Sequence, residues 1–181
     1  MTQPIAGVAP SQLKEVTVMA VWPSLSATTF GRFCGGLYSI DIGFRLFGVP
    51  ITVGRLFALA SIPFMVALYF LMRLPRFPGV IIGITNPWCW QYRLTNRRLI
   101  MENPFGREIK SITLDRFDAI DVVVEAGQAW YSAGDLVFRQ GPVETFRIWG
   151  VPRPETLRHT CLKARMSFVG VKKAREAGLA V

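Results

Sequence analysis

The chain contains few side chains that usually carry chemistry, and none is spaced like a known reaction centre. His159 is the single histidine, and Cys161 follows it without the further Cys or His residues that a zinc site requires. Asp115, Asp118 and Asp121 recur every third residue but lack the glycine and terminal glutamate of an EF-hand calcium loop. The sequence has no phosphate-binding glycine loop and no nucleophile elbow. We therefore expect a protein without enzyme activity, bound metal or other cofactor.

Basic residues are the stronger candidates for a binding surface. The 181 residues include 21 Lys and Arg against 12 Asp and Glu, a formal net charge of +9. Such cations attract anionic membrane lipids, pair with an acidic partner, or set the topology of a membrane protein. Nucleic acid and small-molecule substrates are not expected, because the sequence contains no motif for either. The candidate lipid- or partner-binding residues are Arg93, Arg97, Arg98, Lys163, Arg165, Lys172, Lys173 and Arg175.

An uncharged apolar run extends from Leu56 to Met72 and is bracketed by Arg55 and Arg73. It divides the cations of the chain into those before it and those after it. A helix of about 17 to 25 apolar residues can cross the hydrocarbon core of a bilayer. Pro63 would cost a soluble helix about 3 kcal/mol but is better tolerated in membranes. We therefore predict a transmembrane helix over residues 54–76, kinked at Pro63. Its expected anchoring residues are Arg55, Leu56, Pro63, Tyr69, Arg73, Trp88 and Trp90.

Two segments before this run allow more than one structure. Residues 1–27 are expected to be an N-terminal extension, within which residues 15–22 fit a short strand or an interfacial anchor equally well. Residues 28–53 are apolar and aromatic but contain Arg32, Asp41 and Arg45. These charges favour an interfacial or partly inserted segment over a second membrane span. The alternation within residues 39–46 also fits a strand.

The rest of the chain has the pattern of a small β-rich domain. Short apolar and β-branched segments alternate with turn residues. A proline-rich step at residues 151–154 then opens a helix whose apolar side chains recur at helical spacing. We predict an α+β, mostly β domain over residues 85–177, a seven-stranded sandwich or barrel capped by a C-terminal helix. The expected strands are residues 88–95, 99–102, 107–114, 119–124, 130–131, 135–139 and 145–149.

Four segments of this region stand in a characteristic order. They read YRLTNRRLI at residues 92–100, ITLDRFDAI at 112–120, AGDLVF at 133–138 and FRIWGVPRPE at 146–155. Together they resemble the bacterial pleckstrin-homology-like (PH-like) domain of small membrane-anchored proteins. The resemblance implies a PH-like fold and membrane association, with no enzyme activity and no agreed ligand. Members of that family often carry a two-helix membrane hairpin before the domain, whereas residues 28–47 are too charged for a first membrane helix.

These predictions lead to two functional hypotheses. Counting Arg93, Arg97 and Arg98, cations after the apolar run outnumber those before it, which predicts a bacterial inner-membrane protein with a cytoplasmic C-terminal domain. The apolar surplus of residues 28–53 favours a non-catalytic accessory subunit of a larger integral membrane complex, contacting integral membrane protein subunits. An energy-transducing complex, respiratory or photosynthetic, is one candidate. The alternative is a stand-alone membrane-anchored module that senses anionic lipid headgroups.

Overall fold

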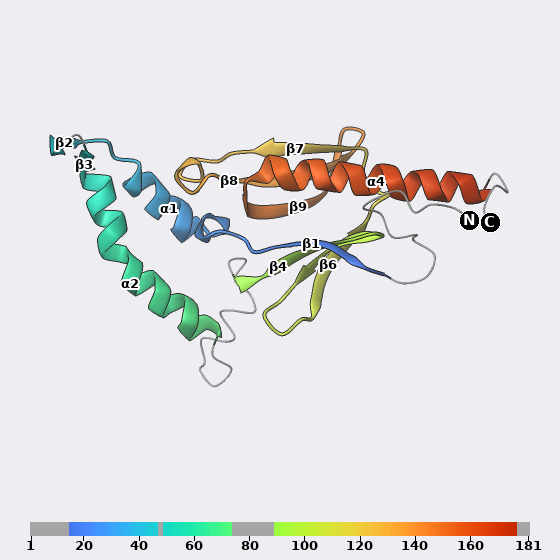
Figure 1. The fold of residues 1–181 in the computed structure, drawn as a ribbon, viewed down its shortest axis with the longest axis horizontal. Helices are drawn as coiled ribbons and strands as arrows, with labels where there is room; N and C mark the ends of the chain where they lie inside the picture. Colours follow the sequence, from blue (N-terminus) through green and yellow to red (C-terminus); the bar gives the residue numbers. More distant parts are fainter. Residues whose placement is uncertain (1–14, 47–48, 74–88, 177–181) are drawn as a thin grey trace.

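The computed structural model describes residues 15–46, 49–73 and 89–176. In these residues a β-rich body and a projecting arm can be distinguished (Figure 1). The body contains a four-stranded antiparallel sheet in the order β1-β4-β5-β6 and a three-stranded antiparallel sheet in the order β7-β8-β9. The strands of the first sheet are β1 (Thr17–Val21), β4 (Gln91–Thr95), β5 (Arg98–Glu102) and β6 (Glu108–Thr113). Those of the second are β7 (Ala119–Val123), β8 (Ala133–Gln140) and β9 (Val143–Pro152), after which comes helix α4 (Pro154–Glu176).

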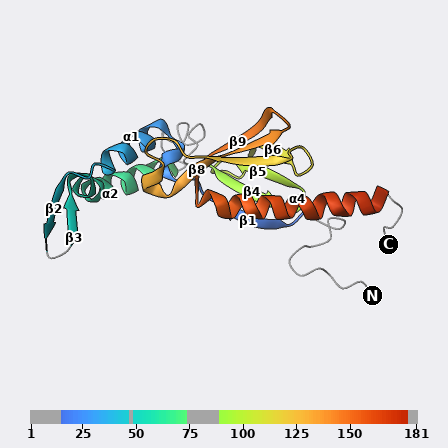
Figure 2. The same ribbon diagram turned by 90° about the horizontal axis from the view of Figure 1, so that it is seen from above.

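The hydrophobic core lies between the two sheets and beneath α4. Strand alternation directs one set of side chains inward, and Leu94, Phe138 and Ile148 are completely buried there. Tyr92 joins the sheets, because its hydroxyl donates to the Trp149 carbonyl at 3.0 Å and accepts from the Trp149 N–H at 3.1 Å. Burial in this position raises the pKa of Tyr92. The first turns of α4 close the core with buried Leu157 and Cys161. Figure 2 shows α4 running along the body and ending far from the arm.

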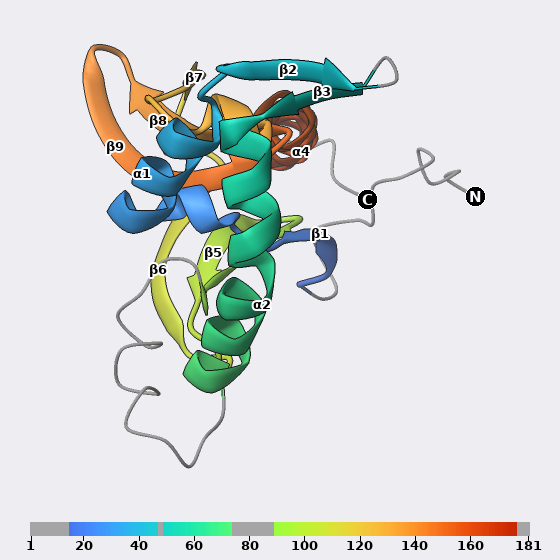
Figure 3. The ribbon, with the colours of Figure 1, turned by 90° about the vertical axis from the view of Figure 1, so that its left-hand side faces the viewer.

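The arm is inserted between β1 and β4. It consists of the short 3-10 helix η1 (Leu25–Ala27), helix α1 (Thr29–Tyr38), the hairpin β2 (Gly43–Leu46) with β3 (Val49–Thr52), and helix α2 (Val53–Arg73). Helix α1 begins where Thr28 caps it, since the Thr28 hydroxyl accepts the Gly31 N–H at 3.0 Å. Figure 3 views the molecule from the arm and shows α2 in front of the body with the hairpin above it.

Most of the predicted α+β architecture is confirmed, and two details of the strand prediction are wrong. Residues 130–131 are not a strand, because they belong to the 3-10 helix η3 (Ala129–Tyr131). The seventh strand of the body is instead β1, which lies in the predicted N-terminal extension and pairs with β4. Of the two structures left open for residues 15–22, the strand is thus the one observed. The described part of residues 28–53 contains α1 and the hairpin, so both a helix and strands occur there.

The helix predicted over residues 54–76 is confirmed as α2, up to Arg73. Residues 74–76 of that range lie outside the described residues. No helix within the part of the chain that the structure describes is both long and apolar enough to cross a membrane. Membrane crossing by this segment therefore stays a prediction.

Candidate interaction surfaces

Helix α2 exposes apolar side chains on most of its circumference. A narrow side formed by Gly54, Ala58, Ser61 and Met65 is at least partly buried. The remaining sides carry large apolar residues with 41–66% of their surface exposed. A helix that is apolar all round is normally enclosed by a protein core or a membrane. The exposed residues are Val53, Leu56, Phe57, Leu59, Ile62, Phe64, Val66 and Phe70.

The narrow buried side of α2 packs on the end of α1. A Cβ atom added to Gly54 would lie less than 3.0 Å from the Tyr38 carbonyl oxygen, so glycine is what allows the backbones to approach. The Tyr38 hydroxyl and the Ser61 hydroxyl form a hydrogen bond of 2.6 Å. Ser61 also donates to the Ala58 carbonyl at 2.8 Å. These contacts fasten the two helices near the hairpin.

Helix α1 in turn docks on the β7–β8 connection, residues 124–132, through a second pair of glycines. A Cβ atom on Gly35 would lie less than 3.0 Å from the Gly127 carbonyl oxygen. Gly127 has φ +83°, and a Cβ atom added to it would lie less than 3.0 Å from the Arg32 carbonyl oxygen. Arg32 forms an ion pair with Glu125. Beside these contacts the Tyr38 ring lies 4.8 Å from that of Trp130, centroid to centroid. We call this set of contacts the joint of the arm.

A buried polar network secures the joint to the body. Gln128 and Asp135 are both 0% exposed. Gln128 Nε2 donates to Asp135 Oδ1 at 2.6 Å, and the Gly150 N–H donates to the same oxygen at 3.0 Å. The Glu125 N–H donates to Gln128 Oε1 at 2.8 Å. The network thus links the connection that holds α1 to strands β8 and β9. Sequence reasoning missed this role, although a carboxylate inside the apolar segment 133–138 was a usable signal.

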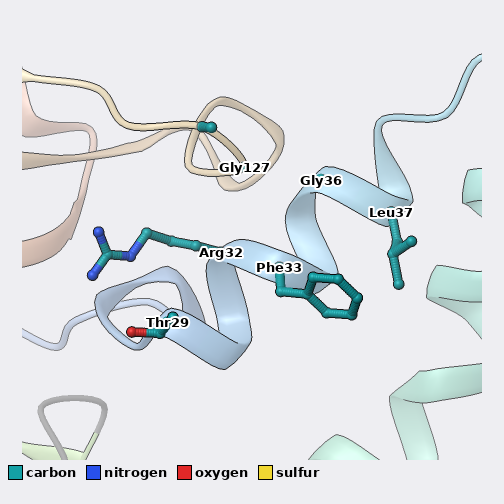
Figure 4. A pocket seen from close by; sticks show the side chains of 7 residues that line it. Thr29, Arg32, Phe33, Gly36, Leu37 and Gly127 are labelled. Carbon is teal, nitrogen blue, oxygen red and sulfur yellow. The ribbon is translucent and has the colours of Figure 1, made fainter.

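An open groove of about 490 Å³ lies between α1 and the β7–β8 connection (Figure 4). Arg32, Phe33 and Leu37 line it from α1, and in Figure 4 the Arg32 side chain points away from Phe33 and Leu37. The only charged side chain of the lining is Arg32, which the ion pair with Glu125 already engages. The groove therefore offers mainly apolar contact. In the described part of the chain no cluster of His, Cys, Asp and Glu could hold a metal ion.

The predicted cations of the β4–β5 turn are mostly neutralised within the protein. Arg93 forms an ion pair with Glu102. Arg98 donates to both oxygens of Glu15, at 2.9 and 3.2 Å, and to Glu108 at 2.9 Å. These hydrogen bonds lower the pKa of Glu15 and raise that of Arg98. Arg97 is exposed at the tip of the turn.

The predicted cations of α4 lie in different surroundings. The Arg165 guanidinium lies 5.9 Å from the centroid of the Phe117 ring, and Lys172 forms an ion pair with Asp115 at 2.9 Å. Lys163 and Lys173 are exposed, and Arg175 belongs to the last turn of the helix. The Leu114 N–H donates to the Arg97 carbonyl at 3.0 Å, one residue before Asp115. The structure thus brings the β4–β5 turn and the end of α4 together, at the end of the body opposite the arm (Figure 1).

The predicted anchoring residues do not form one group. Arg55, Leu56 and Pro63 are exposed on α2, and Tyr69 and Arg73 lie in its last turns. Trp90 belongs to the body and is partly buried, with its ring 6.2 Å from that of Trp149. Trp88 lies outside the described residues.

The side chains first considered for chemistry have structural surroundings. His159 is exposed on α4. The three aspartates do not share a site, because Asp115 pairs with Lys172, Asp118 accepts the Gly141 N–H at 2.9 Å, and Asp121 pairs with Arg139 at 2.6 Å. All three cysteines are free and buried.

Comparison of the chain with protein-family models, curated proteins and solved structures finds no match. The resemblance to bacterial PH-like domains therefore stays a prediction.

Proposed function

We propose that this protein is a non-catalytic accessory subunit of a larger integral membrane complex. The arm is embedded in the membrane part of the complex, and the β-rich body contacts other subunits from the cytoplasmic side of a bacterial inner membrane. The observation that carries the proposal is the apolar surface of α2, of which the described residues cover only the narrow side toward α1. Apolar neighbours would enclose the remaining sides.

The energetic cost of leaving α2 uncovered is large. Full burial of one large apolar side chain is worth about 1.5–3 kcal/mol. Eight such residues on α2 are roughly half exposed, so enclosing them would contribute on the order of 10 kcal/mol. The whole stability of a typical domain is about 5–15 kcal/mol. A partner or a bilayer that covers α2 would therefore gain enough free energy to hold the arm.

The shape of the body supports assigning it a PH-like fold. Four strands and three strands in two antiparallel sheets, with a helix closing the core, are what the resemblance to bacterial PH-like domains implies. In this chain the apolar arm interrupts the body between its first and second strands. A body of this kind, with no metal-binding cluster in its described part, suits a role in protein contacts.

The alternative, a module that senses anionic headgroups, receives less support. Helix α4 starts beside the joint, where the Arg153 N–H donates to the Ser132 carbonyl at 3.0 Å. Lys172 is 18 residues beyond Pro154, about 27 Å along the helix axis. Electrostatic attraction is screened over about 8 Å at physiological salt. A bilayer surrounding the arm would therefore attract the far end of α4 only weakly, and Arg93 and Arg98 are already paired.

Membrane fractionation of the full chain tests the proposal. After alkaline carbonate extraction of native membranes, we expect the protein to stay in the pellet and, in mild detergent, to elute with a larger complex. Leu59→Gln combined with Val66→Gln should release it, because both side chains lie on one exposed side of α2. The matched control is Ile109→Gln with Val143→Gln, two exposed apolar residues of the body. A wild-type chain that is extracted as a monomer would overturn the proposal.

A further inference from the structure

Helix α4 presents a second surface that packing within the described residues does not explain. His159, Lys163, Met166, Gly170 and Lys173 are all exposed, and their spacing places them on one side of the helix. The opposite side packs on the body through Leu157 and Cys161. We call the exposed set the outward stripe of α4.

The charged residues of this stripe are all basic. Between Glu155 and Glu176 the helix contains no acidic residue. Lys163 and Lys173 form no ion pair with any described residue, whereas Lys172 and Arg158 pair with Asp115 and Glu155. The two lysines of the stripe are ten residues apart, about 15 Å along the axis. A complementary surface would present two carboxylates at that separation.

The middle of the stripe is formed by an apolar residue, Met166, and a glycine, Gly170. Met166 is 63% exposed between the two lysines, and methionine adapts well to varied apolar partners. A Cβ atom added to Gly170 would meet nothing within 4 Å, so no contact within the described chain requires glycine there. Glycine is unfavourable in a helix interior. Close approach of another backbone would explain its presence, whereas attraction to a lipid surface would not.

We propose that the outward stripe of α4 docks an acidic helix of a partner protein. Carboxylates of that helix pair with Lys163 and Lys173, an apolar residue between them covers Met166, and its backbone crosses α4 at Gly170. This inference concerns a surface separate from the arm, so it stands or falls independently of the proposed membrane function.

A designed peptide provides the test. The full-length protein in mild detergent is titrated into a fluorescent alanine-rich helical peptide that carries two glutamates ten residues apart around a leucine. A peptide with glutamine in place of both glutamates is the control. We expect tighter binding of the glutamate peptide, weakened by salt. Lys163→Ala and Lys173→Ala should each weaken it about two- to fivefold, whereas Lys110→Ala, at an exposed lysine of β6, should leave it unchanged.

Gly170→Ala separates close approach from charge alone. The substitution should raise the melting temperature, because alanine favours the helix and meets no neighbour, and yet it should weaken peptide binding. Absence of binding, equal binding of both peptides, or full binding by the Gly170→Ala variant would overturn the proposal. Vesicles containing phosphatidylglycerol are the competing ligand. If they bind through Lys163 and Lys173 while the glutamate peptide does not, the stripe is a lipid surface and the proposal is wrong.

Discussion

Adjacent glycines in α1 differ in what lies beside them, and substitution of each by alanine should have a different effect. A Cβ atom on Gly35 would overlap the Gly127 carbonyl, whereas one on Gly36 would meet nothing within 4 Å. Both alanines gain about 1 kcal/mol of helix propensity, so that term cancels when the two variants are compared. Overpacking costs about 1–3 kcal/mol. We therefore expect Gly36→Ala to stabilise α1 by up to about 1 kcal/mol and Gly35→Ala to be less stable than Gly36→Ala by about 1–3 kcal/mol.

Amide hydrogen exchange followed by mass spectrometry measures this difference locally, because opening of the joint need not unfold the body. In the Gly35→Ala variant, peptides from α1 should exchange faster than in wild type, while peptides from β4 and β5 should be unchanged. In the Gly36→Ala variant, peptides from α1 should exchange more slowly. Equal protection of α1 in the two variants would show that it is not held against the β7–β8 connection, and the reasoning about the joint would be refuted.

Other contacts of the body give further expected outcomes. Because Arg98 lowers the pKa of Glu15 below its ordinary value of 4.5, the pair stabilises the fold above that pH and is lost as pH falls through the folded pKa. Denaturant unfolding should therefore find Glu15→Gln less stable than wild type near neutral pH but not in acid; a gap that persists in acid would argue against the pair. Gln128→Ala should lower the free energy of unfolding by about 2–4 kcal/mol, since it leaves buried groups around Asp135 unpaired; a loss within measurement error would dismiss the network. Burial raises the pKa of Cys161 to about 12, so a thiol reagent should label it only after unfolding, and fast labelling of the native protein would contradict this.

The strands that could be predicted from the sequence are those with local signals. Alternating apolar residues bounded by turn residues identify β4, β5, β6, β7, β8 and β9 within a few residues of their observed limits. Residues 130–131 lie in a 3-10 turn rather than a strand, because Gly127 at φ +83° and Ser132 at φ +49° turn the backbone on either side of them. Two aromatic residues resemble a short strand only when the backbone around them is unknown.

The pairing of β1 with β4 could not be predicted, because the whole arm separates these two strands in the sequence. Thr17 is opposite Thr95 in the sheet, although they are far apart in the sequence. The ion pair of Arg98 with Glu15 follows from that register. The sequence indicated Arg98 as a cation available to a ligand. Only the tertiary structure shows that the carboxylates of Glu15 and Glu108 already pair with it. The same holds for Asp135, whose buried partners come from a loop and from β9.

The apolar character of α2 was evident from the sequence, but its covered side was not. The uncharged run predicts a helix in apolar surroundings whatever its neighbours are. The side of α2 that faces α1 is the one on which Gly54 and Ser61 contact Tyr38. This contact joins the helix before the β2–β3 hairpin to the helix after it. The structure therefore adds which sides of the helix remain for a partner.

Solvent access to the outward side of α2 in native membranes tests the proposed embedding most directly. Leu59→Cys and Val143→Cys introduce thiols at positions that are 66% and 61% exposed in this chain alone. Membrane fragments open on both sides are treated with a membrane-impermeant maleimide, and the native cysteines are buried. We predict rapid labelling at position 143 and protection at position 59 until detergent and denaturant are added. Equally rapid labelling at both positions would contradict the embedding of α2.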